Sequence, residues 1–221
     1  MCDYKYKLCY VVYIDILGFK NKVFESTKDE KVLNEIIDLQ DYLSIIQKDN
    51  GVSEKKAYFI SDSIFLVFPF EKNDLSCVLW EIADIQARLI EMEFLIRGGL
   101  TIGDVIFSDK FLFGPAVTEA VQIEQKNENP CVVLSYHFFE DYLIKKAKID
   151  YGDISQEIEE ALLYLSKNEN FRWITHINEQ DLTIDKKDTR KQLIEMIEKG
   201  KKNQNDRVKN KYIWLENNID L

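Results

Sequence analysis

Two hydrophobic stretches, each with one carboxylate, constrain most strongly what this chain can fold into. Residues 9–19 form a run of apolar, β-branched and aromatic residues, with Asp15 near the end and Gly18 just beyond it. Such a run, closed by glycine, is typical of a buried strand. Residues 58–68 have two apolar halves on either side of Ser61-Asp62-Ser63. This pattern predicts a β-hairpin with Asp62 at its turn.

Asp15 and Asp62 each have an ordinary explanation and a functional one. Aspartate is common at helix caps and in turns, and taken singly each residue fits that role. A carboxylate at the end of a hydrophobic strand, however, is costly to bury unless something compensates its charge. Two such acids together indicate a divalent-metal site of the kind that binds nucleoside triphosphates.

Composition narrows the class of protein. The chain has 221 residues, 46% of them hydrophobic, which suffices for one well-packed core and is short for two full domains. A net charge of −10 argues against a general binder of nucleic-acid backbones. No stretch approaches the roughly 18 uncharged apolar residues of a membrane helix, and the first residues lack the apolar core of a signal peptide. The four cysteines contain no Cys-x-x-Cys pair, so we expect reduced thiols in a cytoplasmic protein.

The remaining pattern predicts alternating helices and strands. Helices are expected over residues 29–48 and 75–93, from Pro115 to about residue 125, and after a cap at Ser135. Strands are expected over residues 94–102 and 132–134, with a turn at Gly103-Asp104 and a returning strand over 105–107. The order predicts an α+β fold, a mixed sheet flanked by helices and close to a ferredoxin-like plan.

The composition changes beyond about residue 150. Residues 155–167 are amphipathic, residues 171–177 are strand-like, and residues 189–217 form a highly charged helical tail with a polar break after Lys199. We therefore divide the chain into a core of residues 1–150 and a C-terminal helical extension of residues 151–221, packed on the same domain.

Four short motifs over residues 10–135 occur in the order and spacing of one enzyme family. They are Ile14-Asp15-Ile16-Leu17-Gly18-Phe19, Ser61-Asp62-Ser63, Arg97-Gly98-Gly99-Leu100-Thr101-Ile102-Gly103 and Gly114-Pro115-Ala116-Val117-Thr118-Glu119-Ala120. These resemble, in turn, the first metal-binding segment, the Gly-Asp-Ser hairpin, the Arg-x-Gly-Ile-His-Thr-Gly strand and the helix-opening Gly-x-x-Val-Asn-x-Ala of the class III nucleotidyl cyclases. The short chain, the Arg-Gly-Gly strand and the closing Lys211-Tyr212-Ile213-Trp214-Leu215 are most similar to the pyrimidine cyclases of bacterial Pycsar anti-phage systems.

The resemblance implies a cyclase catalytic domain with a two-metal site. Asp15 and Asp62 would hold two Mg²⁺ or Mn²⁺ ions together with the main chain of Ile16, and the backbone at Gly18 and Phe19 would contact phosphate. In the family, the ribose 3′-hydroxyl attacks the α-phosphorus, which closes the 3′,5′-cyclic ring and expels pyrophosphate. In-line phosphoryl transfer of this kind needs charge neutralisation and positioning more than a covalent nucleophile. The family also implies a homodimer with shared active sites, and a separate effector protein that senses the cyclic nucleotide.

Two departures from the family pattern concern the base. Tyr58 occupies the place of the lysine with which purine cyclases read their base, and Phe111 falls where their base-reading aspartate would be. A tyrosine hydroxyl can hydrogen-bond a pyrimidine, and its ring can fill the space that a purine would need. We therefore expect UTP as substrate and cyclic UMP as product. The alternative for Tyr58 is an ordinary strand residue of the core.

Two further departures concern catalysis. Thr118 replaces an asparagine and can still hydrogen-bond ribose, whereas Gln122 replaces the arginine that stabilises the transition state and cannot neutralise charge there. Arg97 or Lys126 is a candidate for that role. Arg97 lies beside two glycines, where a ligand or another backbone can approach closely, so it either contacts the substrate's phosphate or forms an ion pair with a core acid.

Three functions remain open at this point. The first is an active pyrimidine nucleotide cyclase that makes a second messenger in anti-phage defence, which the two metal aspartates favour. The second is a degenerate, nucleotide-binding regulatory module, which the loss of the arginine at Gln122 favours. The third is an adenylate or guanylate cyclase with unusual base contacts.

Overall fold

The computed structural model describes residues 4–48, 54–148, 154–166, 174 and 186–218. Its centre is a mixed sheet with the strand order β2-β3-β1-β4-β5, in which β6 also pairs with β4. The strands are β1 (Lys7–Ile16), β2 (Lys56–Ile60), β3 (Ser63–Pro69), β4 (Ile96–Ser108), β5 (Phe111–Phe113) and β6 (Val132–Leu134). β1 runs antiparallel to both β3 and β4, while β6 is parallel to β4.

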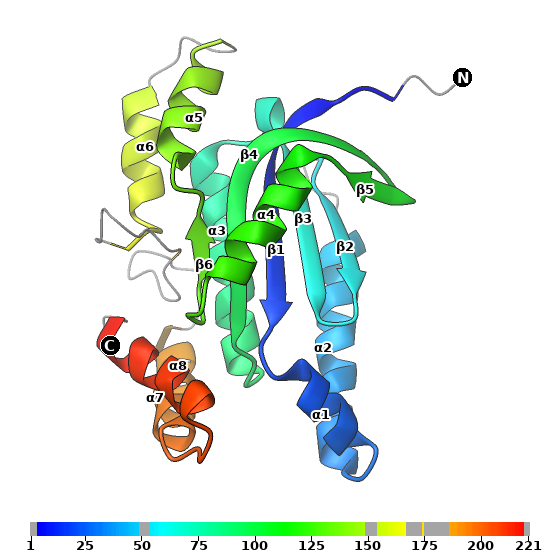
Figure 1. Ribbon diagram of the computed structural model, residues 1–221, viewed down its shortest axis with the longest axis vertical. Helices are drawn as coiled ribbons and strands as arrows, with labels where there is room; N and C mark the ends of the chain where they lie inside the picture. The colour runs from blue at the N-terminus through cyan, green and yellow to red at the C-terminus, as the bar shows by residue number, and fades with distance from the viewer. Residues whose placement is uncertain (1–3, 49–53, 149–153, 167–173, 175–185, 219–221) are drawn as a thin grey trace.

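Helices flank this sheet (Figure 1). They are α1 (Phe19–Ser26), α2 (Glu30–Lys48), α3 (Leu75–Glu91), α4 (Pro115–Lys126), α5 (Phe138–Lys146), α6 (Ile154–Leu162), α7 (Lys186–Gly200) and α8 (Asp206–Asn218), with a short 3₁₀ turn η1 (Phe70–Lys72). α4 crosses one face of the sheet, whereas α2 and α3 lie behind it. The mixed α+β architecture predicted from the sequence is confirmed.

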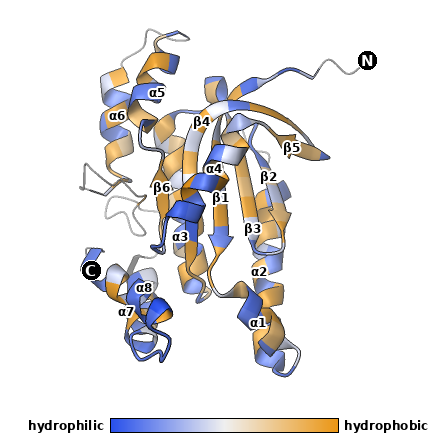
Figure 2. Ribbon diagram, viewed as in Figure 1, coloured by the Kyte–Doolittle hydropathy of each residue, from blue (hydrophilic) through white to orange (hydrophobic). Residues whose placement is uncertain are grey.

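The alternation of side chains along β1 gives the sheet two different faces. Tyr10, Val12 and Ile14 are fully buried in the main hydrophobic core, which includes residues of α2 and α3. On the other face, Cys9 and Val11 pack in a smaller cluster with residues of α4. Asp15 continues this second series at the end of β1, so it emerges on the face that α4 covers only in part. Figure 2 shows the hydrophobic centre of the sheet and the polar outer surfaces of the helices.

Most predicted elements are confirmed, including the hairpin at Asp62 and the helices α2, α3 and α4. The predicted turn at Gly103-Asp104 is wrong, because β4 continues through it and pairs with β1 as far as Val105. Gly103 instead serves close packing, since a Cβ there would lie 3.1 Å from the Cβ of Ala116 on α4. The strand returns later, at Asp109-Lys110, into β5.

Two helix starts also differ from the prediction. α5 begins at Phe138 with His137 as its N-cap, so Ser135 is not the cap; its carbonyl accepts a hydrogen bond from the Phe138 amide instead. α1 was not predicted, because its eight residues carry no clear helical spacing of apolar residues, with Phe19 alone buried.

The C-terminal extension packs against the core. The predicted charged tail forms α7 and α8, which break after Gly200. Buried residues of α7 and Leu215 of α8 share a hydrophobic cluster with Ile90 of α3 and Leu95. Of the predicted strand over residues 171–177, only Ile174 is among the described residues, where it forms an isolated bridge with Leu165. The proposed boundary near residue 150 lies outside the described residues and stays a prediction.

No helix in the described ranges is long and apolar enough to cross a membrane. Cys9, Cys77 and Cys131 carry free thiols, and Cys9 and Cys131 are buried. Cys2 lies outside the described residues.

Candidate active site

Asp15 is held near the end of β1 between two neighbouring strands. It pairs in register with Ser63 of β3 on one side and with Arg97 of β4 on the other. Directly paired residues of antiparallel strands project on the same face of a sheet, so these three side chains lie together on the face that carries α4. The Asp15 carboxylate is half-buried there.

Asp62 is brought to the same place by the turn of the β2–β3 hairpin. Ser61 and Asp62 are the two residues between the strands, and Ser61 has a positive φ of 60°. The Asp62 carbonyl accepts a hydrogen bond of 3.0 Å from the Ile16 amide. This contact fixes the hairpin turn against the end of β1, and both sequence-predicted aspartates therefore lie at one end of the strands, in the middle of the sheet.

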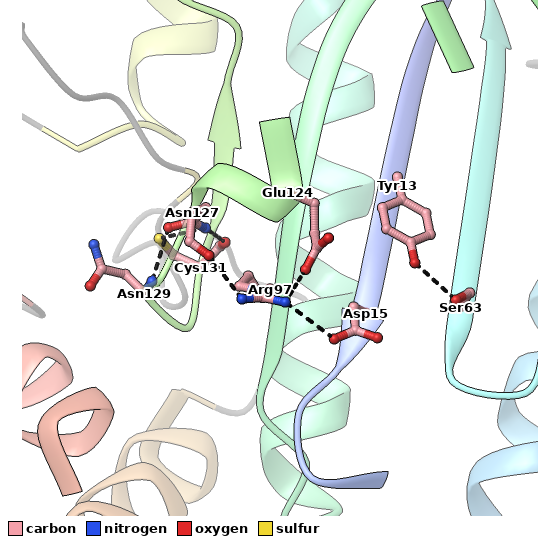
Figure 3. Close-up of polar contacts among 8 residues, drawn as sticks. All are labelled: Tyr13, Asp15, Ser63, Arg97, Glu124, Asn127, Asn129 and Cys131. Carbon is pink, nitrogen blue, oxygen red and sulfur yellow. Dashed lines mark hydrogen bonds and ion pairs between the residues drawn. The ribbon is translucent and has the colours of Figure 1, made fainter. Parts of the chain in front are cut away.

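Arg97 links Asp15 to a second acid, Glu124 of α4 (Figure 3). Its Nη2 atom lies 3.7 Å from Oδ2 of Asp15 and forms an ion pair with Glu124. Its Nη1 atom donates a hydrogen bond of 3.1 Å to the carbonyl of Asn127. Asn127 is fixed in turn by donating to the carbonyl of Cys131 at 2.7 Å. The ion pair to a core acid, left open by the sequence, is thus present.

Glycine at position 99 makes this arrangement possible. A Cβ there would lie 2.6 Å from the carbonyl oxygen of Ala120 and 2.7 Å from the Cβ of Ile123, both on α4. Because α4 can approach β4 so closely, Glu124 reaches Arg97. The close approach expected beside Arg97 is therefore that of a helix.

The electrostatics of the two acids reflect burial. Burial raises the pKa of Asp15, the charge of Asp62 raises it further, and Arg97 and Lys211 lower it. Burial likewise raises the pKa of Glu124, while Arg97 opposes that shift. The net pKa shift of both acids is therefore upward, because burial outweighs the opposing effect of the nearby cations.

The donor set fits a divalent cation that binds together with a phosphate ligand. No group of three or more His, Cys, Asp or Glu side chains in the described ranges could hold a metal on its own. Asp15 and Asp62 repel each other strongly enough to shift the pKa of Asp15, and a divalent cation between them would remove that repulsion. Mg²⁺ is commonly bound by one or two carboxylates, with water and substrate phosphates completing its shell.

Gly18 and Phe19 follow β1 after a single intervening residue, Leu17. Gly18 has a φ of 78° and precedes the first residue of α1, Phe19. A Cβ at Gly18 would meet nothing within 4 Å, so glycine is needed here for its conformation and not for space. The free backbone N–H groups of a helix N-terminus favour anions, so the predicted phosphate contact is chemically reasonable at this position.

Tyr58 lies farther along the same face as Asp15. Tyr58 pairs with Phe65, and Phe65 with Tyr13, which forms a row of three half-buried aromatic side chains across β2, β3 and β1. The Tyr58 hydroxyl donates a hydrogen bond of 2.8 Å to the carbonyl of Ser108, and burial raises its pKa to about 12. Its hydroxyl is therefore a neutral group that retains a lone pair for a further donor.

Phe111 lies in β5, where its ring is 5.8 Å from that of Phe113. Neither ring is placed by a described contact against Asp15 or Asp62.

Thr118 and Gln122 are not brought together with the aspartates in this chain. Both are exposed on α4, one turn apart, whereas Ala116, Ala120 and Glu124 form the buried side of the helix. A shift of two residues turns a helix by about 200°, which places Thr118 and Gln122 on the outer side.

Sequence reasoning missed Glu124 and Asn127. A signal existed for Glu124, because it follows Ala116 and Ala120 at intervals of four residues and so shares their buried face. An acid at such a position indicates a buried cationic partner.

Comparisons with known proteins bear on the fold. No protein-family model matches the chain, and no curated protein matches it. The structure of the adenylyl cyclase CyaB from P. aeruginosa superimposes with a TM-score of 0.50 at 19% identity, over 65% of this chain and 83% of that chain. The chain has the class III cyclase fold.

Two guanylyl cyclase structures are also similar to the chain. Guanylyl cyclase Cya2 matches with a TM-score of 0.49 at 14% identity, over 81% of this chain and 97% of that chain. The catalytic core of a rhodopsin-guanylyl cyclase with converted specificity, in complex with ATPalphaS, matches with a TM-score of 0.47 at 22% identity, over 62% and 82%.

Proposed function

We propose that the protein is a nucleotidyl cyclase that converts a pyrimidine nucleoside triphosphate, UTP above all, into its 3′,5′-cyclic monophosphate and pyrophosphate. The observation that carries this proposal is that Asp15 and Asp62 lie at the same end of the strands in a class III cyclase fold, where the Ile16 amide donates a hydrogen bond to the Asp62 carbonyl. Asp15, Asp62 and the main chain of Ile16 would hold two Mg²⁺ or Mn²⁺ ions.

The residues of the site have distinct tasks in this proposal. When bound, the ions would lower the pKa of the ribose 3′-hydroxyl and neutralise charge on the triphosphate. Gly18 and Phe19 would bind phosphate through the N-terminus of α1. Arg97, held by Glu124 and Asn127, keeps the Asp15 carboxylate in position. Arg97 is thus engaged by protein groups, which favours a positioning role over the phosphate contact that the sequence left open.

Base choice is proposed to depend on Tyr58. Its row with Phe65 and Tyr13 offers an aromatic surface on the face that carries Asp15, and such a surface can stack a base. We expect Tyr58→Ala to change the ratio of kcat/KM between UTP and the other triphosphates more than it changes Tm. A uniform loss on all four triphosphates that follows the loss of stability would assign Tyr58 to the core alone.

The activity is tested by incubation with ATP, GTP, CTP and UTP separately, each with Mn²⁺. The expected result is pyrophosphate and cyclic UMP from UTP, lost in Asp15→Asn and Asp62→Asn. Asp104→Asn is the matched control, because Asp104 is an exposed acid on β4. Activity retained in the Asp15 and Asp62 variants would refute the metal assignment. Cyclic AMP or cyclic GMP as the main product would refute the base assignment.

A second candidate function is a nucleotide-binding regulatory module without turnover. The specific observation in its favour is that Gln122 is exposed and neutral where the resembled family has an arginine. Tight binding of a triphosphate with no cyclic product from any of the four would support it.

We also propose a homodimer with shared sites. Thr118 and Gln122 face outward on α4, away from Asp15, so a triphosphate held by a second chain could reach them. Ile60 and Phe113, exposed by 69% and 49%, add apolar surface on β2 and β5. The proposal predicts that an inactive Asp15→Ala chain, mixed with an inactive Thr118→Ala/Gln122→Ala chain, recovers activity. Absence of recovery despite proven subunit exchange would mean self-contained protomers.

The scattered free thiols support a cytoplasmic location, and the resemblance to the Pycsar cyclases supports a role in anti-phage defence with a separate effector protein. Infection of cells that carry the gene with or without Asp15→Asn tests that role.

A further inference from the structure

Two hydroxyl groups form a pair on the face of the sheet that carries Asp15 (Figure 3). The Tyr13 hydroxyl and Oγ of Ser63 lie 3.0 Å apart and are hydrogen-bonded to each other. Ser63 is the residue that pairs with Asp15 across β1 and β3. Tyr13 lies two residues before Asp15, so its side chain projects on the same face. The Tyr13 side chain therefore leans along β1 toward the level of Asp15.

The Tyr13 ring is held by its neighbours. It lies 4.7 Å from the ring of Phe65, the residue with which Tyr13 pairs on β3. Tyr13 also packs against the smaller hydrophobic cluster on this face of the sheet. These contacts fix the direction in which the hydroxyl points. Tyr13 and Ser63 are both only half-buried, so neither residue is closed off from a ligand.

The pair has hydrogen-bonding capacity left. Each hydroxyl offers one hydrogen and two lone pairs, and the bond between the two uses one hydrogen and one lone pair. Neither hydroxyl forms a further hydrogen bond with a residue in the ranges that the structure describes. One O–H hydrogen and several lone pairs therefore remain, so the pair can donate to a ligand and accept from it at the same time.

The position of the pair along the strands indicates which part of a nucleotide would meet it. In the proposed site, the metal ions at the level of Asp15 bind the phosphates and the aromatic row that includes Phe65 receives the base. These two levels are two residues, or about 7 Å, apart along a strand. The hydroxyl pair joins them, since Ser63 is level with Asp15 and Tyr13 is level with Phe65. The sugar of a nucleotide connects its phosphates to its base, so the ribose would lie at the pair.

We propose that Tyr13 is a substrate-binding residue whose hydroxyl, oriented by Ser63, hydrogen-bonds the ribose 2′-hydroxyl of the nucleoside triphosphate. The 2′-hydroxyl is both a donor and an acceptor, which matches the remaining capacity of the pair. This inference rests on the proposed function and gives the site a preference for ribonucleotides over 2′-deoxyribonucleotides. Thr118, which the sequence suggests for a ribose contact, faces outward on α4 and does not supply this contact from within the protomer.

Binding of nucleotides that cannot cyclise tests the inference apart from turnover. The full chain is titrated calorimetrically in Mg²⁺ with 3′-deoxyuridine triphosphate, which keeps the 2′-hydroxyl, and with 2′,3′-dideoxyuridine triphosphate, which lacks it. The corresponding adenosine, guanosine and cytidine compounds are measured in the same way, so the result does not depend on the base assignment. Wild type is compared with Tyr13→Phe and Ser63→Ala. Tyr136→Phe is the matched control, because it removes the same hydroxyl from a residue that is 90% exposed between β6 and α5.

The quantity that decides is the ratio of the two affinities. Wild type should bind the 3′-deoxy nucleotide about fivefold or more tighter than the dideoxy nucleotide, which is the effect of one neutral hydrogen bond. In Tyr13→Phe the ratio should fall to about one, because the ring and its contact with Phe65 remain while the hydroxyl is lost. Ser63→Ala should give an intermediate ratio, since the Tyr13 hydroxyl loses its orienting partner. Tyr136→Phe should keep the wild-type ratio.

Two results would overturn the inference while leaving the nucleotide site intact. One is equal affinity of wild type for the two nucleotides. The other is a wild-type ratio in Tyr13→Phe, even if both affinities fall, because a purely structural disturbance weakens the two ligands equally. If wild type binds none of the nucleotides, the proposed function fails and this inference fails with it.

Discussion

Replacement of Arg97 by methionine tests the charge arrangement at the heart of the site. The side chain of Glu124 is 4% exposed and that of Arg97 18% exposed, so their ion pair is largely withdrawn from water. Removing one partner of a buried ion pair typically costs about 3–5 kcal/mol, because the other charge is left uncompensated. Arg97 is partly exposed, so we expect the lower end, about 3 kcal/mol.

The double variant Arg97→Met/Glu124→Met separates the cost of an orphaned charge from the loss of the pair. Well-packed apolar residues can replace a buried ion pair with little loss of stability. We therefore expect the double variant to lie within about 1 kcal/mol of wild type, although the single Arg97 variant is much less stable.

The cost of Arg97→Met should depend on pH. Burial already raises the pKa of Glu124 above its ordinary value of 4.5, and Arg97 opposes that rise. Without Arg97 the pKa of Glu124 in the folded state rises further. Between the pKa of Glu124 in the unfolded state and its pKa in the folded state, the folded protein therefore binds more protons than the unfolded protein. The stability of the variant therefore falls as pH rises through this window, and its deficit is greater at pH 8 than at pH 5.

Urea unfolding of the metal-free proteins at pH 5 and pH 8 measures both effects. A deficit below about 1 kcal/mol at pH 8, or one that is equal at the two pH values, would refute the view that Arg97 compensates a buried carboxylate.

Three further predictions concern stability. Asp15→Asn should raise the Tm of the protein in a chelator at pH 7. The pKa of Asp15 is raised in the folded state, so its negative charge destabilises the fold at pH values above the ordinary pKa of aspartate. The gain in Tm should vanish at acid pH, and a lower Tm at pH 7 would contradict this prediction. Ser61→Gly should raise the free energy of unfolding, measured in urea, by about 0.5–1 kcal/mol. Ser61 has a φ of 60° at the first position of the hairpin turn, where glycine is favoured. An unchanged free energy of unfolding would argue against backbone strain at Ser61. Gly99→Ala should lower the free energy of unfolding by about 1–3 kcal/mol, because its Cβ would lie 2.6 Å from the carbonyl oxygen of Ala120. Gly18→Ala is the control for a purely conformational cost, because a Cβ at Gly18 has open space around it. Equal losses in the two variants would refute the packing argument.

The elements that the sequence predicted well are those whose signals are local. The strand that carries Asp15 and the hairpin at Asp62 each show their apolar runs and turn residues within about a dozen positions. Their meeting follows from one pairing, that of β1 with β3. The aspartates could therefore be placed together before the structure was known.

The errors have equally physical reasons. Gly103 followed by Asp104 looks like a turn, yet the glycine is there because α4 passes 3.1 Å from where its Cβ would be. A residue sequence does not distinguish a glycine needed for a turn from one needed for close packing. The same ambiguity at Gly99 concealed the approach of α4, and with it the partner of Arg97.

Charge compensation at the site was the least predictable feature, because it joins elements far apart in the chain. Asp15 lies in β1, Arg97 in β4 and Glu124 in α4. No spacing rule connects three such elements, since their proximity arises from the packing of α4 on the sheet.

This distribution of charge has a consequence for how the site could work. Arg97 forms an ion pair with Glu124, and its Nη2 atom lies 3.7 Å from Oδ2 of Asp15. Arg97 therefore neutralises the charge of Asp15 only in part. Burial and the charge of Asp62 still raise the pKa of Asp15, because Arg97 offsets them only in part. A carboxylate that is fully paired with an arginine competes poorly as a metal ligand, whereas one left partly unbalanced gains more from a divalent cation. The pair of Arg97 and Glu124 thus leaves Asp15 with charge that the proposed divalent cation would balance.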